Sequence, residues 1–157
     1  MCIKSSGLRE NIARKCLISA SKQRNRETEL IIIFNGIYPY RDEFITYCDQ
    51  WHEREADIFP GKTFNIGVEM AKGESIFYMS NDAFLKDGAV AESARLLQKY
   101  PQYIITPLHA NRLKSKRNNL LVDGYYGNDR IGDLVGCMSK KHIQDIGRMD
   151  EVCYLTD

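Results

Sequence analysis

The sequence lacks a long hydrophobic run. Its longest apolar stretch covers residues 30–34, whereas a helix that crosses a membrane needs roughly 20 mostly apolar residues. The first residues also lack the apolar segment that a secretory signal peptide carries. We therefore expect no transmembrane segment and no leader, and a protein of the cytoplasm.

Paired cysteines and closely spaced histidines are missing too. The five cysteines are scattered and form no C-x-x-C pair. Such an odd, unpatterned set is typical of reduced, mostly buried thiols in an intracellular protein. The three histidines lie far apart, without the i, i+4 spacing of helical metal ligands. This spacing argues against a zinc site.

Charge of one sign is not in excess. The chain has 22 Lys and Arg against 21 Asp and Glu, which gives a net charge of +1. This balance argues against a dedicated nucleic-acid-binding or membrane-surface protein. The 157 residues, of which 43% are hydrophobic, are typical of one globular domain with its own core. We therefore expect a single domain over residues 1–157.

What the chain does contain is an alternation of helical and strand-like patterns. This alternation predicts an α/β fold of Rossmann-like type, with a mostly parallel central sheet flanked by helices. The expected helices cover 9–22, 62–72, 88–100 and 140–146. Another helix is expected to start at Pro39 and to carry Phe44, Tyr47, Cys48 and Trp51 on one face. The expected strands cover 1–4, 29–34, 56–59, 75–79, 103–106 and 134–138.

Polar side chains follow two of the expected strands. Ser80, Asn81 and Asp82 follow the strand at 75–79, and Asn35 follows the strand at 29–34. In open parallel α/β sheets, ligands bind outside the carboxyl ends of the strands. Asp82 then either contacts a ligand or caps the next turn, and Asn35 either contacts a ligand or forms an Asn-Gly turn with Gly36.

Five short motifs occur in a fixed order along the chain. They are KCLIS with KQ at 15–19 and 22–23, ELIIIFNG at 29–36, N-x-G with AKGE at 65–67 and 71–74, SND at 80–82, and GCMSKK with GRMDE at 136–141 and 147–151. In order and spacing they resemble a family 2 glycosyltransferase of the GT-A fold, truncated at both ends. The resemblance implies a nucleotide-sugar-binding domain that transfers a sugar from a nucleotide-diphosphate sugar to a hydroxyl acceptor (glycan, lipid or protein), with inversion.

The resemblance also implies roles for individual residues. Ser80-Asn81-Asp82 is similar to the family's DxD-type motif, with Asp82 as the ligand of Mn²⁺ or Mg²⁺ and Ser80 or Asn81 at the ribose. Asn35 would contact the base, although the family usually has a carboxylate in this turn. Asn65 would reach the diphosphate or, alternatively, hold a loop in place. Asp157 would be the base that deprotonates the acceptor, and the alternative is a frayed chain end.

The chemistry of the reaction agrees with these residue types. Breaking the bond between sugar and phosphate builds negative charge on the leaving diphosphate, which a divalent cation stabilises. Mn²⁺ and Mg²⁺ prefer oxygen ligands and often keep several waters, so one or two carboxylates are enough to hold them. The base Asp157 would take the proton of the attacking hydroxyl.

Residues 108–130 form a long polar segment, which we expect to be a loop. It contains a basic cluster of four residues, Arg112, Lys114, Lys116 and Arg117. The cluster either closes over the diphosphate, meets an acidic acceptor, or belongs to a solvated loop. RNA binding is disfavoured, because no aromatic residues are interleaved with the basic ones.

Two other functions remain open at this point. The chain could be a non-catalytic module that binds a nucleotide or nucleotide sugar, or a degenerate GT-A partner subunit without activity. A nucleotidyltransferase is disfavoured, because no glycine-rich loop with Lys or Arg follows the first strand. The short first strand leaves a sheet position that a second copy of the chain could cover, so a homo-oligomer also stays open.

Overall fold

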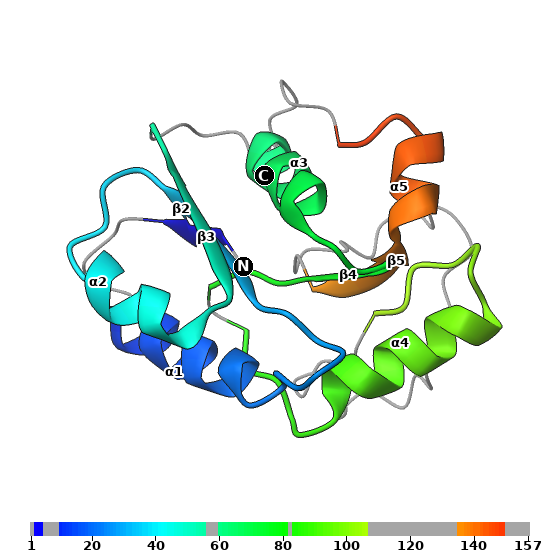
Figure 1. The fold of residues 1–157 in the computed structure, drawn as a ribbon, viewed down its shortest axis with the longest axis horizontal. Helices are drawn as coiled ribbons and strands as arrows, with labels where there is room; N and C mark the ends of the chain where they lie inside the picture. Colours follow the sequence, from blue (N-terminus) through cyan, green and yellow to red (C-terminus); the bar gives the residue numbers. More distant parts are fainter. Residues whose placement is uncertain (1, 5–9, 56–59, 82, 107–134, 150–157) are drawn as a thin grey trace, which may run out of the picture.

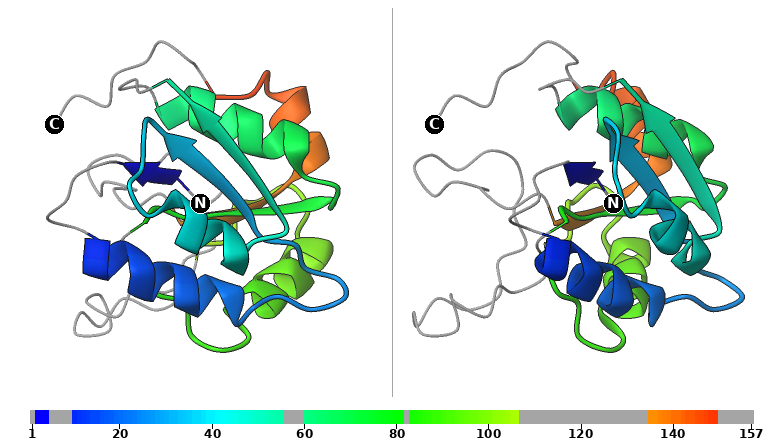
Figure 2. Two further views of the ribbon diagram at one scale, coloured as in Figure 1. Left: turned by 60° about the vertical axis from the view of Figure 1, so that its left-hand side comes forward. Right: turned by 90° about the vertical axis from the view of Figure 1, so that its left-hand side faces the viewer.

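The computed structural model describes residues 2–4, 10–55, 60–81, 83–106 and 135–149. Two small sheets lie between two layers of helices (Figure 1). The helices α1 (Glu10–Ser21), α2 (Arg41–Phe44) and α4 (Ala89–Lys99) lie on one side, and α3 (Pro60–Met70) and α5 (Lys140–Asp145) lie on the other. The two turned views keep this arrangement (Figure 2). The mixed α/β architecture with a parallel sheet confirms the expected fold class.

The first sheet is parallel and has the order β1-β2-β3. Its strands are β1 (Cys2–Lys4), β2 (Ile31–Asn35) and β3 (Gln50–Arg54). The central strand β2 is an unbroken apolar run with its last four residues buried, as expected for a strand covered on both faces. The register aligns the last residues of all three strands, since Lys4 is opposite Asn35 and Asn35 is opposite Arg54.

The second sheet is an antiparallel pair of β4 (Ser75–Tyr78) and β5 (Gly136–Ser139). A further antiparallel bridge joins Ile105 to Cys137. The chain thus returns beside β4 only after α4 and the residues that follow it. The Ser139 hydroxyl then accepts a hydrogen bond of 2.9 Å from the His142 N–H and caps α5.

The buried apolar residues form separate clusters, each between a sheet and one of the two helix layers. Ala13 and Leu17 of α1 pack in one cluster with Ile32 and Phe34, on one face of β2. On the opposite face, α3 comes so close that a Cβ on Gly67 would lie 3.8 Å from Ile33. The two faces of the β4–β5 sheet are covered by two further clusters. The cluster beside α3 and α5 consists of Val68, Ile76, Met138 and Ile143. The cluster beside α4 consists of Leu97, Ile105 and Cys137.

Two expectations, one of a helix and one of a strand, were wrong in the described residues. The helix expected from Pro39 ends early: α2 stops at Phe44, a 3-10 turn (Ile45–Tyr47, η2) follows, and Trp51 belongs to β3. The apolar residues of this region have helical spacing, but the backbone of residues 50–54 pairs with β2, and this pairing outweighs the local pattern. Residues 103–106 form isolated bridges instead of a strand, among them the bridge from Ile105 to Cys137. The strand expected at 56–59 lies outside the described residues.

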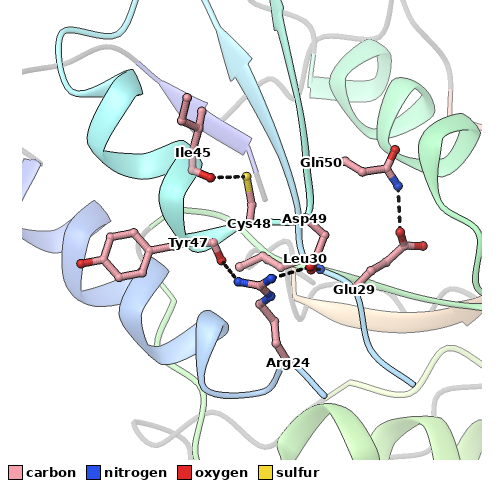
Figure 3. Close-up of polar contacts among 8 residues, drawn as sticks. All are labelled: Arg24, Glu29, Leu30, Ile45, Tyr47, Cys48, Asp49 and Gln50. Atoms are coloured by element: carbon pink, nitrogen blue, oxygen red, sulfur yellow. Dashed lines mark hydrogen bonds and ion pairs between the residues drawn. The ribbon is translucent and has the colours of Figure 1, made fainter. Parts of the chain in front are cut away.

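A polar network fixes the amino-terminal ends of β2 and β3 (Figure 3). Asp49 accepts a hydrogen bond of 2.8 Å from the Leu30 N–H and pairs with Arg24, which also donates to the Tyr47 carbonyl at 2.8 Å. Burial opposes ionisation of Asp49, yet these two donors hold its carboxyl pKa below the ordinary value. The network therefore fixes the register of the two strands at the edge opposite to the candidate site.

Candidate functional site

The aligned carboxyl ends of β1, β2 and β3 form one side of the candidate site. Asn35 ends β2 and is only 5% exposed, between Lys4 and Arg54 in the register. Gly36 follows with φ 98°, a left-handed conformation that favours glycine. Its N–H donates to the Arg54 carbonyl at 3.0 Å. The chain therefore bends at Gly36, and this bend is held at the edge of the sheet.

Aromatic packing positions the chain after this turn. The Tyr38 ring stacks on Phe34 with centroids 5.9 Å apart and lies 5.1 Å from the Phe44 ring. Burial raises the pKa of the Tyr38 hydroxyl. The Arg14 guanidinium binds both carboxylate oxygens of Glu43, at 2.8 and 2.7 Å, and lowers the pKa of that carboxyl. The pair ties α2 to α1.

The end of β4 forms the other side of the candidate site. Met79 is buried in a cluster with Cys16 and Ala20 of α1. Ser80 is half-buried, and its carbonyl accepts a hydrogen bond of 3.4 Å from the Cys16 thiol. Asn81 is 9% exposed. Since α1 also packs on β2, one helix connects the two strands that carry Asn35 and Ser80-Asn81.

Two more side chains of the first helical region contact the segment after β4. The Leu85 N–H donates to the Ser19 hydroxyl at 3.2 Å, and the Gln23 amide donates to the Lys86 carbonyl at 3.2 Å. Together with Cys16, these are the uncharged polar positions of the KCLIS and KQ motifs. The sequence singled out the motifs but gave them no role; the structure places them against residues on both sides of position 82.

Asn65 lies on α3 and is 4% exposed. Its amide donates to the Met149 carbonyl at 2.9 Å, and its carbonyl oxygen accepts from the Met149 N–H at 3.1 Å. Next to it, Arg148 forms an ion pair with Glu69. Asn65 thus holds the chain after α5 against α3. Its expected contact with a diphosphate stays a prediction.

Arg54 is a candidate that sequence reasoning missed. It ends β3 opposite Asn35, and its guanidinium lies 3.5 Å from the hydroxyl of the buried Thr63 in the first turns of α3. The sequence placed this region between a helix and a strand at 56–59. A strand assignment of residues 50–54, parallel to 31–35, would have put Arg54 at the carboxyl edge.

The structure does not describe all of the expected site. Asp82 and Asp157 lie outside the described residues, as do the basic cluster and the whole segment 108–130. In the described part of the chain, no group of three or more His, Cys, Asp or Glu side chains could hold a metal ion. No helix in that part is long and apolar enough to cross a membrane.

The architecture is that of known glycosyltransferase structures. The mannosyltransferase PcManGT from Pyrobaculum calidifontis, in complex with GDP-Man and Mn²⁺, matches with a TM-score of 0.70 and 9% identity, over 96% of this chain and 47% of that chain. TarS from S. aureus matches with a TM-score of 0.65 and 14% identity, over 96% of this chain and 29% of that chain. The complex of TarS 1–349 with UDP-GlcNAc matches with a TM-score of 0.62 and 12% identity, over 92% of this chain and 46% of that chain.

These likenesses define a GT-A-like glycosyltransferase fold. No protein-family model matches the chain. No protein with a curated description matches it either. The chain spans between 29% and 50% of the length of the TarS and mannosyltransferase structures.

Proposed function

We propose that the chain binds a nucleotide-diphosphate sugar at the carboxyl ends of β2 and β4 and transfers the sugar to a hydroxyl acceptor. The observation that carries this proposal is the GT-A-like fold, in which buried Asn35 ends β2 and buried Asn81 follows the end of β4. Two structural neighbours are complexes with GDP-Man and with UDP-GlcNAc, which supports this class of donor.

Positive charge at the strand ends supports an anionic donor. Arg54 lies beside Asn35 in the register of the parallel sheet. A guanidinium can bind a phosphate through two parallel hydrogen bonds. A diphosphate at this edge would therefore meet the Arg54 guanidinium beside the amide that is proposed to contact the base.

The proposal includes Mn²⁺ or Mg²⁺. Since the described residues contain no ready-made metal cluster, the ion would depend on Asp82 and on the phosphate oxygens of the donor itself. The neighbouring Ser80 and Asn81 offer further oxygen atoms, which suit these hard cations. A bound ion would supply charge stabilisation to the departing diphosphate.

The transfer step requires a base on the acceptor side. We propose Asp157 for this role and inversion at the anomeric carbon, in which the acceptor hydroxyl attacks from the face opposite to the diphosphate. Asp157→Asn should then reduce the turnover number strongly and leave the affinity for the donor unchanged. A variant with unchanged turnover would contradict the assignment.

Calorimetric titration tests the donor site. UDP and GDP are titrated into the chain with and without Mn²⁺, and the titrations are repeated on Asp82→Ala. We expect one nucleotide to bind in a metal-dependent way and the variant to lose about tenfold or more in affinity, because even residues that only orient a metal ligand contribute about 10- to 100-fold. Asp87→Ala is the matched control, since Asp87 is exposed in the same segment.

The outcomes separate the two candidate functions. Metal-dependent binding that fails only in Asp82→Ala supports the site, and release of free sugar or transfer to an acceptor then supports the enzyme. Binding without any turnover of the sugar donor favours the non-catalytic binding module. A folded chain that binds neither nucleotide contradicts the proposed function.

A further inference from the structure

A row of polar side chains on the first helix contacts the segment that follows β4. Cys16 and Ser19 are three residues apart and share a face of α1, and Gln23 lies just after the last turn of this helix. The three side chains reach the backbone at Ser80, at Leu85 and at residue 86, respectively, over distances of 3.4, 3.2 and 3.2 Å. The order of the three residues along the chain is therefore the same as the order of their partners in the segment.

Burial makes these contacts specific. Cys16 is fully buried, Gln23 is 8% exposed, and Ser19 is half-buried. The Ser19 hydroxyl donates to the Cys16 carbonyl at 2.7 Å within the helix and accepts from the Leu85 N–H at 3.2 Å. A buried amide without a hydrogen-bond partner is costly, so Gln23 favours a segment conformation that presents a backbone carbonyl to it. All three partners in the segment are backbone atoms. Because the row binds backbone atoms, it fixes the path of the segment independently of the side chains that the segment carries.

The apolar residues of the segment add a second attachment. Met79, Ala83 and Leu85 pack in the cluster that contains Cys16 and Ala20. Residues 79–80 and 83–86 thus have both polar and apolar contacts, which are made by α1 and by Gln23 just after it. The segment carries Ser80 and Asn81, which the proposed function places at the donor.

The geometry points to Cys16, Ser19 and Gln23 as positioning residues of the donor site, which hold residues 80–81 and 83–86 in their binding conformation without contacting the donor. This inference rests on the proposed function of the site. In the unbound chain the row orders the segment in advance, so donor binding does not have to supply the ordering free energy. Weakening the row should therefore lower the affinity for the metal–nucleotide complex.

Ser19→Ala and Gln23→Met test the inference, because both keep most of the side-chain volume and remove one contact to the segment. Ser21→Ala is the matched control: Ser21 lies on the same helix, and in the described part of the chain its hydroxyl bonds only to the Ile18 carbonyl within that helix. Ser19→Thr keeps the hydroxyl and serves as the rescue variant.

Three quantities are measured for each variant: amide hydrogen exchange of residues 80–88, the dissociation constant for UDP or GDP with Mn²⁺, and the urea midpoint of unfolding. We expect Ser19→Ala and Gln23→Met to exchange faster in this segment and to bind the metal–nucleotide complex roughly three- to tenfold more weakly, the typical effect of one hydrogen bond. Ser19→Thr and Ser21→Ala should resemble the wild type.

Two results would overturn the inference. If the segment exchanges faster while nucleotide affinity stays at the wild-type value, the row only stabilises the fold. If exchange in the segment does not change, the row does not order it. A wild-type chain that binds no nucleotide would instead reject the proposed function together with this role, and the exchange data alone would then report on the attachment of the segment.

Discussion

The two hydrogen bonds between Asn65 and Met149 give a quantitative prediction. Asn65→Ala removes both bonds, of 2.9 and 3.1 Å, at a side chain that is 4% exposed. Each such bond contributes about 1 kcal/mol net, so we expect the free energy of unfolding to fall by about 2 kcal/mol. The loss should exceed that of an average exposed substitution, because the half-buried Met149 backbone keeps its polar groups but loses its partners.

The conformation of the neighbouring residues makes this attachment necessary. Gly147 and Arg148 have φ values of 89° and 72°. The left-handed region costs a residue with a side chain about 1 kcal/mol or more. Two sets of contacts offset that cost: the Arg148 N–H donates to the Ile143 carbonyl at 2.9 Å, and Asn65 binds the backbone of the next residue, Met149. Without Asn65, we expect the chain after α5 to detach from α3 well before the rest of the domain unfolds.

Urea denaturation followed by far-ultraviolet circular dichroism measures the change, and amide exchange at Met149 locates it. Glu69→Ala on the same helix is the control, since it removes only an exposed ion pair with Arg148, and such pairs contribute little. An Asn65→Ala variant within about 0.5 kcal/mol of the wild type would refute the reasoning. The same variant decides the role of Asn65: unchanged nucleotide affinity means a structural role, and weakened affinity at full folding means a donor contact.

Three other predictions follow from single residues. Cys137 is 1% exposed and burial raises its thiol pKa to about 11, so it should resist maleimide at pH 8 in the folded chain and react in guanidinium, as mass spectrometry can show. The Glu43 pKa is lowered by Arg14, so its stabilisation is present above the unfolded pKa and is lost as pH falls through the lower folded value; Glu43→Gln should flatten the acid side of the stability profile measured by urea unfolding. Gly67→Ala should be neutral or stabilising by up to about 1 kcal/mol, since the new Cβ would lie 3.8 Å from Ile33; a lowered melting temperature would contradict this.

Elements with strong periodicity could be predicted from the sequence. The helix expected at 9–22 is α1 at Glu10–Ser21, and the strand expected at 29–34 is β2 at Ile31–Asn35. Both bury an apolar surface that their own residues define, so local pattern and tertiary packing agree. The same holds for α3 and α4, which begin and end within two residues of the expected positions.

Elements that depend on a distant partner could not be predicted. The β3 sequence, QWHER, has no apolar run, and it becomes a strand because its backbone pairs with β2. Nothing local in β4 or β5 indicates that they pair antiparallel. The ends of β2 and β4 lie within one residue of the expected positions. The attachments made by Ser19 and Gln23 are side-chain contacts to backbone far along the chain, which no local pattern specifies.

The pairing of β4 with β5 has a consequence for the order of assembly. The sheet β1-β2-β3, with α1, α2 and α3, is complete once the first half of the chain is available. By contrast, β4 gains its antiparallel neighbour only when residues 136–139 arrive, after α4 and a long intervening stretch. Closing such a distant pair is slow, because chain entropy is lost before the contact forms. During synthesis, the strand that leads to Ser80 and Asn81 would therefore complete its pairing late.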